Sequence, residues 1–220
     1  MGAKAEKKQA KKLGRPVGKC DEADRRDKII AAAIQCFAKK GYAKASNHDI
    51  ALCAGLTSGS LYHYFDSKAS IYREALRAAN QALLDEYRAA CRAVPDASSM
   101  QQLGLGLERV IKLSQRRPGL MRFAAASWEE IRRSDELEWL EPEETTDFQI
   151  FFREMLQRAR ARGELARSID IDVGVRVLIA CISGLASMHD ELRSEKEFAL
   201  LLRTFEHLLK GEFFTWGSSR

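Results

Sequence analysis

Apolar residues recur three or four positions apart along most of the chain, the spacing that places side chains on one face of an α-helix. The first such stripe comprises Ile30, Ala33, Ile34 and Phe37. Asp21 or Asp24 is placed to cap the start of that helix, and Gly41 follows as a stop signal. The sequence shows neither an alternating strand pattern nor an internal repeat, so the predicted fold class is all-α.

Two much shorter helices are expected between residues 46 and 65. Ser46 and Asp49 have the spacing of a capping box, which predicts a helix that ends near Gly55. Thr57 or Ser58 can cap a second short helix. That second helix is expected to carry Leu61, Tyr62 and Phe65. Two short helices joined by a tight turn predict a helix-turn-helix.

Longer helices are expected after this motif. Asp66 or Ser67 opens one that runs to Pro95, and Pro118 starts another. The acidic stretch that follows, residues 134–144, is expected to be irregular. The remaining apolar stripes lie near residues 100–116 and over residues 148–159, 175–185 and 198–209.

The second short helix has the chemistry of a DNA-reading surface. Its first residues are small, namely Ser58, Gly59 and Ser60. The helix N-terminus can therefore come close to base edges, and its amide groups attract phosphate. Aromatic residues with polar tips follow, namely Tyr62, His63 and Tyr64. Such tips suit phosphates and thymine methyl groups, and Lys68 begins the next helix as a phosphate anchor.

Two stretches carry a family resemblance. Residues 30–42 read Ile-x-x-Ala-x-x-x-Phe-x-x-x-Gly-Tyr, and residues 50–68 read Ile-Ala-x-x-Ala-Gly-Leu-Thr-Ser-Gly-Ser-Leu-Tyr-His-Tyr-Phe-x-x-Lys. Over residues 25–75 this pattern resembles the tetracycline-repressor (TetR) family. The resemblance implies a homodimeric transcription factor, usually a repressor, that a small molecule releases from DNA.

The resemblance also implies roles for single residues. The base-facing start of the recognition helix falls on residues 58–60, and Tyr62 and Tyr64 match groups that contact phosphate or thymine. Thr57 and Lys68 match positions that contact the DNA backbone. His48, expected late in the preceding helix, falls where some members place a base-reading side chain. The whole candidate DNA-contact set comprises Arg15, Ser46, Asn47, His48, Thr57, Ser58, Gly59, Ser60, Tyr62, His63, Tyr64 and Lys68.

Positive charge is concentrated at the N-terminus. Residues 1–20 hold seven lysines and arginines and one glutamate, whereas the whole chain has a formal net charge of +5. A basic arm of this kind attracts a polyanion, and its few apolar residues predict disorder. Leu13-Gly14-Arg15-Pro16 resembles the core of an AT-hook, which implies that Arg15 enters a minor groove. A solvated tail remains the alternative.

These observations divide the chain into three parts. An arm (residues 1–20) precedes a DNA-binding domain (22–80, helix-turn-helix at about 46–65) and a ligand-binding and dimerisation domain (81–215). The candidate contacts for a mostly apolar effector are Phe123, Trp128, Phe152, Met155, Met188 and His189. Plain core packing is the alternative for these residues. The last two helices are apolar along their length, so we expect them to pair with those of a second copy as a four-helix bundle.

Several classes of function are excluded by what the sequence lacks. Its five cysteines and four histidines have no metal-ligand spacing, and no catalytic triad, carboxylate pair or cofactor motif is present. We therefore expect no enzyme, metal or cofactor.

The sequence contains no apolar run of about 18 residues, so no membrane span is expected, and unpaired cysteines fit the reducing cytoplasm. The expected partners are double-stranded DNA with a pseudo-palindromic operator, an effector and a second copy. An effector-independent, nucleoid-type DNA-binding protein is the alternative, and a run of arginines (Arg153, Arg158, Arg160 and Arg162) is expected to be a solvated helix face.

Overall fold

The computed structural model describes residues 19–140, 146–188 and 195–212. Over these ranges the chain forms nine α-helices and one 3-10 helix and contains no strand, which confirms the all-α prediction. The N-terminal helices are α1 (Lys19–Lys44), α2 (Asn47–Cys53), α3 (Ser58–Leu61) and α4 (Lys68–Ala93). The others are α5 (Ser99–Arg116), α6 (Leu120–Arg133), η1 (Asp135–Leu140), α7 (Thr146–Ala161), α8 (Ile171–Met188) and α9 (Glu195–Leu209).

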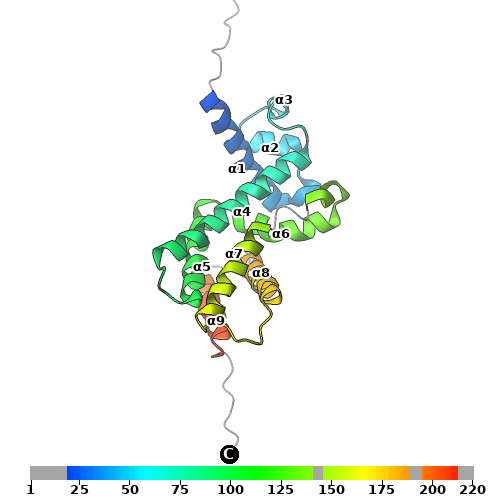
Figure 1. Ribbon diagram of the computed structural model, residues 1–220. Coiled ribbons are helices and arrows are strands. Elements are labelled where there is room, and N and C mark those ends of the chain that lie inside the picture. The colour runs from blue at the N-terminus through cyan, green and yellow to red at the C-terminus, as the bar shows by residue number, and fades with distance from the viewer. Residues whose placement is uncertain (1–18, 141–145, 189–194, 213–220) are drawn as a thin grey trace, which may run out of the picture.

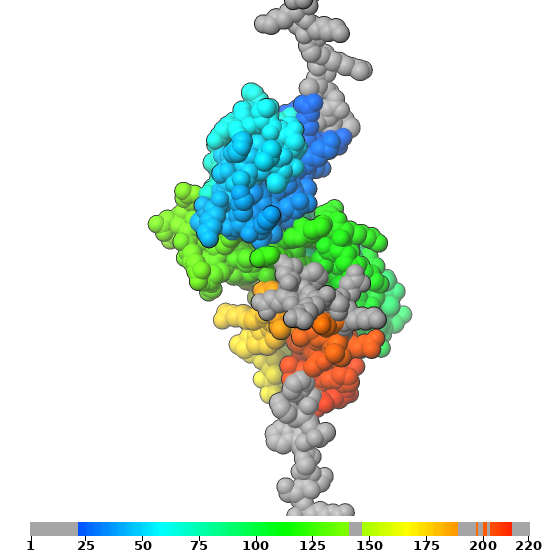
Figure 2. Space-filling model, turned by 180° about the vertical axis from the view of Figure 1, so that it is seen from behind, coloured from blue at the N-terminus to red at the C-terminus, as the bar shows by residue number. Residues whose placement is uncertain are grey.

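The molecule is elongated, and α4 connects its two ends (Figure 1). Helices α1–α3 form one end, while α5 and α7–α9 form the other, and α6 packs against α1, α4 and α8. In the space-filling view the N-terminal helices stand apart as a lobe above the C-terminal half (Figure 2). Because α4 is continuous across residue 80, the expected domain boundary falls inside a helix.

An aromatic cluster joins the two ends. Phe37 of α1 lies 5.0 Å from Tyr72 of α4 and 5.9 Å from Phe123 of α6, measured between ring centroids. Tyr42 also packs edge-on against Tyr72, at 5.2 Å. All four side chains are at least 96% buried. The apolar stripes predicted from the sequence thus pack against each other where α1, α4 and α6 meet.

The helix starts differ from the sequence prediction in a few places. Helix α1 begins at Lys19, so Asp21 and Asp24 lie within it instead of capping it. Gly41 is non-helical, with φ 75° and ψ 165°, and interrupts α1 instead of ending it. Gly119 precedes α6 as its N-cap. The acidic stretch after α6 contains the 3-10 helix η1, because Leu137 and Leu140 there are buried in the core.

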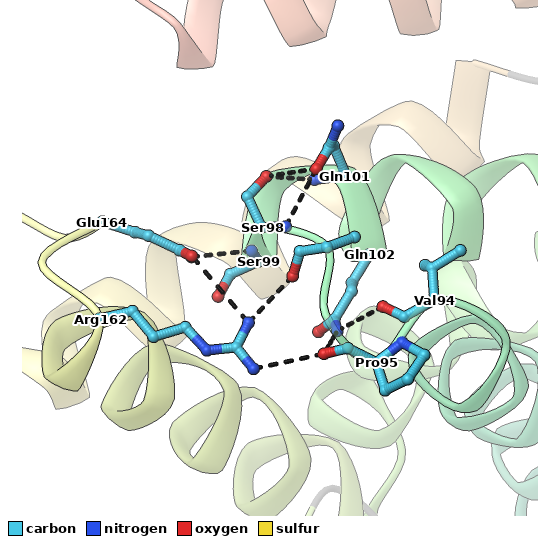
Figure 3. Close-up of polar contacts among 9 residues, drawn as sticks. Val94, Pro95, Ser98, Ser99, Gln101, Gln102, Arg162 and Glu164 are labelled. Carbon is cyan, nitrogen blue, oxygen red and sulfur yellow. Dashed lines mark hydrogen bonds and ion pairs between the residues drawn. The ribbon is translucent and has the colours of Figure 1, made fainter.

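Arg153, Arg158 and Arg162, in and just after α7, are exposed, as the predicted solvated face requires, and Arg160 is partly buried. Arg162 donates from Nη1 to the Ala97 carbonyl (2.9 Å) and from Nη2 to the Pro95 carbonyl (3.3 Å). Glu164 accepts from the Ser99 amide at 2.8 Å, so the segment that follows α7 holds the α4–α5 turn from outside (Figure 3). Gln102 donates to the Val94 carbonyl from within the same turn. These bonds satisfy turn carbonyls that no helix would otherwise pair.

Arg153 and Arg160, also in this run, have partners as well. Arg153 pairs with Asp172 of α8 at 2.7 Å, and Arg160 donates to the Ile169 carbonyl. The α7–α8 connection is therefore anchored by charge as well as by apolar packing. These exposed arginines also find partners because carbonyls and carboxylates from neighbouring segments lie within reach of their long side chains.

Helix α8 is unusually apolar and unusually exposed. Among the described residues it is the one helix that is long and apolar enough to cross a membrane by length and composition, with a mean hydropathy of 1.7. Val173 and Val177 on α8 are each 55% exposed in the single chain. Length and composition are weak evidence for a span, and an apolar face left open on one chain is equally typical of a helix that packs against a second copy.

Candidate nucleic-acid interface and ligand cavity

The start of helix α2 is fixed by the capping box predicted from the sequence. Ser46 Oγ accepts from the Asp49 amide at 3.1 Å, and Asp49 Oδ2 accepts from the Ser46 amide at 3.0 Å. Lys40 of α1 lies 2.6 Å from Asp49 Oδ1. The Lys40 ammonium and the Ser46 donors hold the pKa of the Asp49 carboxyl well below its usual range. The cap therefore also ties α2 to α1.

A tight turn leads from α2 to α3. Gly55 has φ +70°, a conformation that glycine adopts without strain. Ile50 and Leu61 are fully buried and join the two helices to the core. Thr57 is the N-cap of α3: its Oγ1 accepts from the Ser60 amide at 3.2 Å and lies 2.9 Å from Ser60 Oγ. The helix-turn-helix is thus present as predicted.

Polar side chains of α2 and of the α3 region meet at this surface. Asn47 donates from Nδ2 to the Tyr62 hydroxyl at 3.0 Å, and His48 Nδ1 lies 3.3 Å from Ser58 Oγ. Tyr62 is 56% exposed despite this bond. His48 stands at the start of α2 and not late in it, because Ser46 caps that helix one residue before it begins. The predicted DNA-contact residues from 46 to 62 therefore share one polar face.

The recognition helix is shorter than predicted. Helix α3 ends at Leu61, so Tyr62 is its C-cap and Tyr64 and Phe65 lie beyond it. Arg26 of α1 donates to the Tyr64 carbonyl at 3.1 Å, and its guanidinium lies 4.4 Å from the Phe65 ring centroid. Arg26 holds the segment after α3, and no pattern in the sequence singled it out.

Lys68 begins α4, as predicted, and its ammonium is already held in place. Nζ donates to the Tyr42 carbonyl at 2.9 Å and lies 4.1 Å from the Tyr42 ring centroid. A lysine ammonium has three donors, so two remain for a phosphate. A shallow depression surrounds this group, lined by residues that include Ser46, Asn47, Tyr62 and Ser67.

Two carboxylates connect Tyr42 to the second half of the chain. Glu130 of α6 accepts from the Tyr42 amide at 2.8 Å and from the Tyr72 hydroxyl at 2.9 Å. Glu136 of η1 accepts from the Tyr42 hydroxyl at 2.5 Å. Burial and these carboxylates raise the pKa of both tyrosines well above the usual range, so both hydroxyls stay protonated donors. Sequence analysis did not anticipate this network, because its members are 58 to 94 residues apart.

A mostly apolar cavity lies at the other end of α6. The cavity has a volume of about 80 Å³ and is partly open to solvent. Helices α4 to α8 all contribute to the wall, which includes Met121, Phe148, Ile179 and Ile182. Its polar side chains are Asn80, Tyr87 and Ser183, and Trp128 adds an indole.

The candidate effector contacts are distributed unevenly about this cavity. Trp128 and Phe152 line it. Phe123 and Met155 are buried in core packing away from its wall, and Met188 is 42% exposed at the end of α8. These three are therefore corrected to core and surface positions. His189 and residues 1–18 of the N-terminal arm, which include Arg15, lie outside the described residues.

Comparison with known proteins agrees with this arrangement. Residues 29–75 match the family described as bacterial regulatory proteins, tetR family. The transcriptional repressor KstR2 of Rhodococcus jostii (strain RHA1) is 28% identical over 158 residues, which is 70% of this chain and 74% of that protein.

Solved structures show the same fold over most of the chain. The fatty acid degradation regulator FadR of Bacillus halodurans superposes with a TM-score of 0.69 at 19% identity, covering 84% of this chain and 94% of that one. FadR of Bacillus subtilis, solved in complex with stearoyl-CoA, gives a TM-score of 0.67 at 20% identity, covering 86% and 99%.

A helix-turn-helix at one end of an all-helical chain, with a body of packed helices at the other, defines a DNA-binding transcriptional regulator. The match over residues 29–75 confirms the resemblance to the TetR family that the recognition region from Ile50 to Lys68 indicated.

Proposed function

We propose that the protein is a dimeric, sequence-specific repressor that a mostly apolar small molecule releases from DNA. One observation carries this proposal: α6 lines the cavity with Trp128 and, two residues later, uses Glu130 to hold the segment beside the helix-turn-helix. Under this proposal residues 22–80 bind DNA, residues 81–215 hold the effector and the dimer interface, and the protein acts in the cytoplasm, where bacterial DNA lies.

The DNA contacts follow from the exposed polar face. Residues 58–60 at the start of α3 enter the major groove, where the absence of a side chain at Gly59 allows close approach. Tyr62 uses its free donor on phosphate while its oxygen accepts from Asn47. Lys68 and Thr57 contact the backbone, and His48 stands beside Ser58 at the groove edge.

The second copy is supported by the open apolar face of the last two helices. Val173 and Val177 of α8 and Leu200 and Leu208 of α9 are between 47% and 65% exposed. Exposing four large apolar side chains to water is unfavourable. A symmetric pairing of α8 and α9 with the same helices of a second copy would bury these side chains. Two recognition helices related by a two-fold axis then require a pseudo-palindromic operator.

The effector acts by linkage. A molecule that prefers the arrangement unfit for DNA lowers the affinity for DNA by the same factor by which DNA lowers the affinity for that molecule. Since α6 packs on α1, α4 and α8, a shift that widens the cavity is transmitted to the Tyr42 network. An effector-independent DNA-binding protein would have no use for a cavity at this place.

The test is the effect of small molecules on operator binding by the full-length protein. Fluorescence anisotropy of a labelled operator, selected from DNA flanking the coding sequence, is measured across a panel of apolar metabolites. At least one compound should release the operator, and filling the cavity by Ala124→Trp should abolish its effect without weakening DNA binding. Release that is unchanged in the filled variant would contradict the proposed pocket.

A further inference from the structure

An acidic side chain lies among the predicted DNA contacts. The depression around Lys68 has a volume of about 810 Å³ and is broadly open, so a phosphate fits within it. The residues described as lining it include two lysines, Lys44 and Lys68, and one acid, Glu136 of η1. Glu136 is exposed. A negative charge at this place opposes the anion that the two lysines attract.

A single phenol ring holds both of the charges concerned. The Lys68 ammonium lies 4.1 Å from the Tyr42 ring centroid and donates to the Tyr42 carbonyl. Glu136 Oε2 accepts from the hydroxyl of the same ring at 2.5 Å. Tyr42 is only 4% exposed, so the core fixes the ring and with it the position of the carboxylate. A phosphate bound to Lys68 would therefore lie in the field of Glu136, at a range over which salt screens charges incompletely.

The carboxylate comes from the half of the chain that holds the cavity. Helix η1 follows α6 after one residue and packs against it. Leu137 and Leu140 anchor η1 in the core, and α6 contributes Trp128 to the cavity wall. The position of Glu136 thus depends on α6, whereas Lys44 and Lys68 belong to α1 and α4.

We propose that Glu136 limits the affinity of the protein for DNA: its carboxylate opposes the phosphate that Lys68 attracts, and so keeps binding weak enough for an effector to reverse. This inference rests on the proposed function, since it requires that Lys68 contacts a phosphate. It adds to the polar face a contribution of opposite sign, supplied by the effector-binding half of the chain. Because both contributions are electrostatic, both weaken as salt rises.

Three substitutions separate the charge of Glu136 from its hydrogen bond. Glu136→Gln removes the charge but keeps an oxygen that can accept from the Tyr42 hydroxyl. Tyr42→Phe removes the hydroxyl but keeps the carboxylate. Glu138→Gln changes another exposed acid of η1, one that is not among the described lining residues, and controls for net charge. Binding of each full-length variant to a labelled duplex of random sequence is measured by fluorescence anisotropy over a range of salt concentrations.

Glu136→Gln should bind DNA about 3-fold more tightly per subunit at low salt, the size of one repulsion between unit charges in a largely aqueous site. The gain should shrink as salt rises. Glu138→Gln should give a clearly smaller gain, and Tyr42→Phe none. In a Lys68→Ala background the gain from Glu136→Gln should also fall, because the phosphate is then no longer held near the carboxylate.

The inference and the proposed function fail in different ways. A Glu136→Gln variant that binds no more tightly than wild type or than Glu138→Gln would overturn the inference. A gain that Tyr42→Phe reproduces would overturn it as well, since the lost hydrogen bond and not the charge would then be the cause. Lys68→Ala that leaves both the affinity and its salt slope unchanged would instead contradict the proposed phosphate contact itself.

Discussion

Gly41 illustrates how a single residue positions the interface. Its φ of 75° and ψ of 165° lie in a region that is essentially restricted to glycine. A Cβ added there would also come within 2.8 Å of Glu130 Oε1, the atom that accepts from the adjacent Tyr42 amide. The backbone conformation and the contact between the two halves of the chain thus require the same residue.

Gly41→Ala should therefore destabilise the protein by about 1–3 kcal/mol, the cost of such backbone strain. Urea unfolding followed by circular dichroism measures the loss. Gly59→Ala is the matched control, since a Cβ at Gly59 would meet only Thr57 Oγ1 at 3.9 Å. A Gly41→Ala variant as stable as the control would show that the kink is not constrained.

Lys68 and Ser60 should separate backbone contact from base readout. Lys68→Ala should weaken operator and random DNA alike and reduce the salt slope of binding by about 1 per subunit. Ser60→Ala should instead change the preference among operator variants. Anisotropy titrations over a range of salt concentrations measure both effects, and a uniform loss for Ser60→Ala would assign that hydroxyl to the backbone or to the Thr57 cap.

At the scale of elements, α2 depends on a charged cap. The pKa of Asp49 is lower in the folded state than in the unfolded chain, where an aspartate titrates near pH 3.9. This group therefore stabilises the fold above about pH 4, and its contribution is lost as the pH falls through the folded pKa.

Asp49→Asn should lower the free energy of unfolding at pH 7, and the difference from wild type should shrink as the pH falls below about 4. Urea unfolding at pH 7, 5 and 3 measures this difference. Ser46→Ala, which removes the uncharged partner in the box, should cost about 1 kcal/mol. A wild-type advantage over Asp49→Asn that persists unchanged at pH 3 would contradict the role of the carboxylate.

The elements that were predicted correctly are those whose signals are local. Ser46 with Asp49, Thr57, and Ser67 cap the helices that their spacing predicted, and Gly55 makes the expected turn. The sequence prediction failed where contacts with residues far away in the sequence determine the local structure. The acidic stretch forms the 3-10 helix η1 because Leu137 within it is buried in the core.

The candidate sites follow the same rule. The polar face of the helix-turn-helix was predictable because it lies within about twenty residues of sequence. The cavity was only partly predictable: Trp128 and Phe152 line it, but Phe123 of the same apolar pattern packs into the aromatic cluster instead. Apolar spacing shows that a side chain points inward, but not whether the space beyond it is filled. Tyr87 carries no signal of its own in the sequence.

At the scale of the whole molecule, the exposed face of α8 should be the dimer interface. Val177→Glu places a charge at the centre of this face and should convert the dimer into a monomer that binds the operator weakly. Light scattering coupled to gel filtration measures the mass. Ile150→Glu, at an apolar position on α7 that is 48% exposed, is the control and should remain dimeric. A Val177→Glu variant that stays dimeric would place the interface elsewhere.

The central claim is that two copies of this chain read DNA together through α3. Selection from a random DNA pool with the full-length protein, followed by sequencing of the bound fraction, tests it most directly. The account predicts an inverted repeat with half-sites about 34–36 Å apart, or a multiple of that distance, and two chains on each site. A single asymmetric half-site with one chain bound, or no enriched sequence at all, would contradict it.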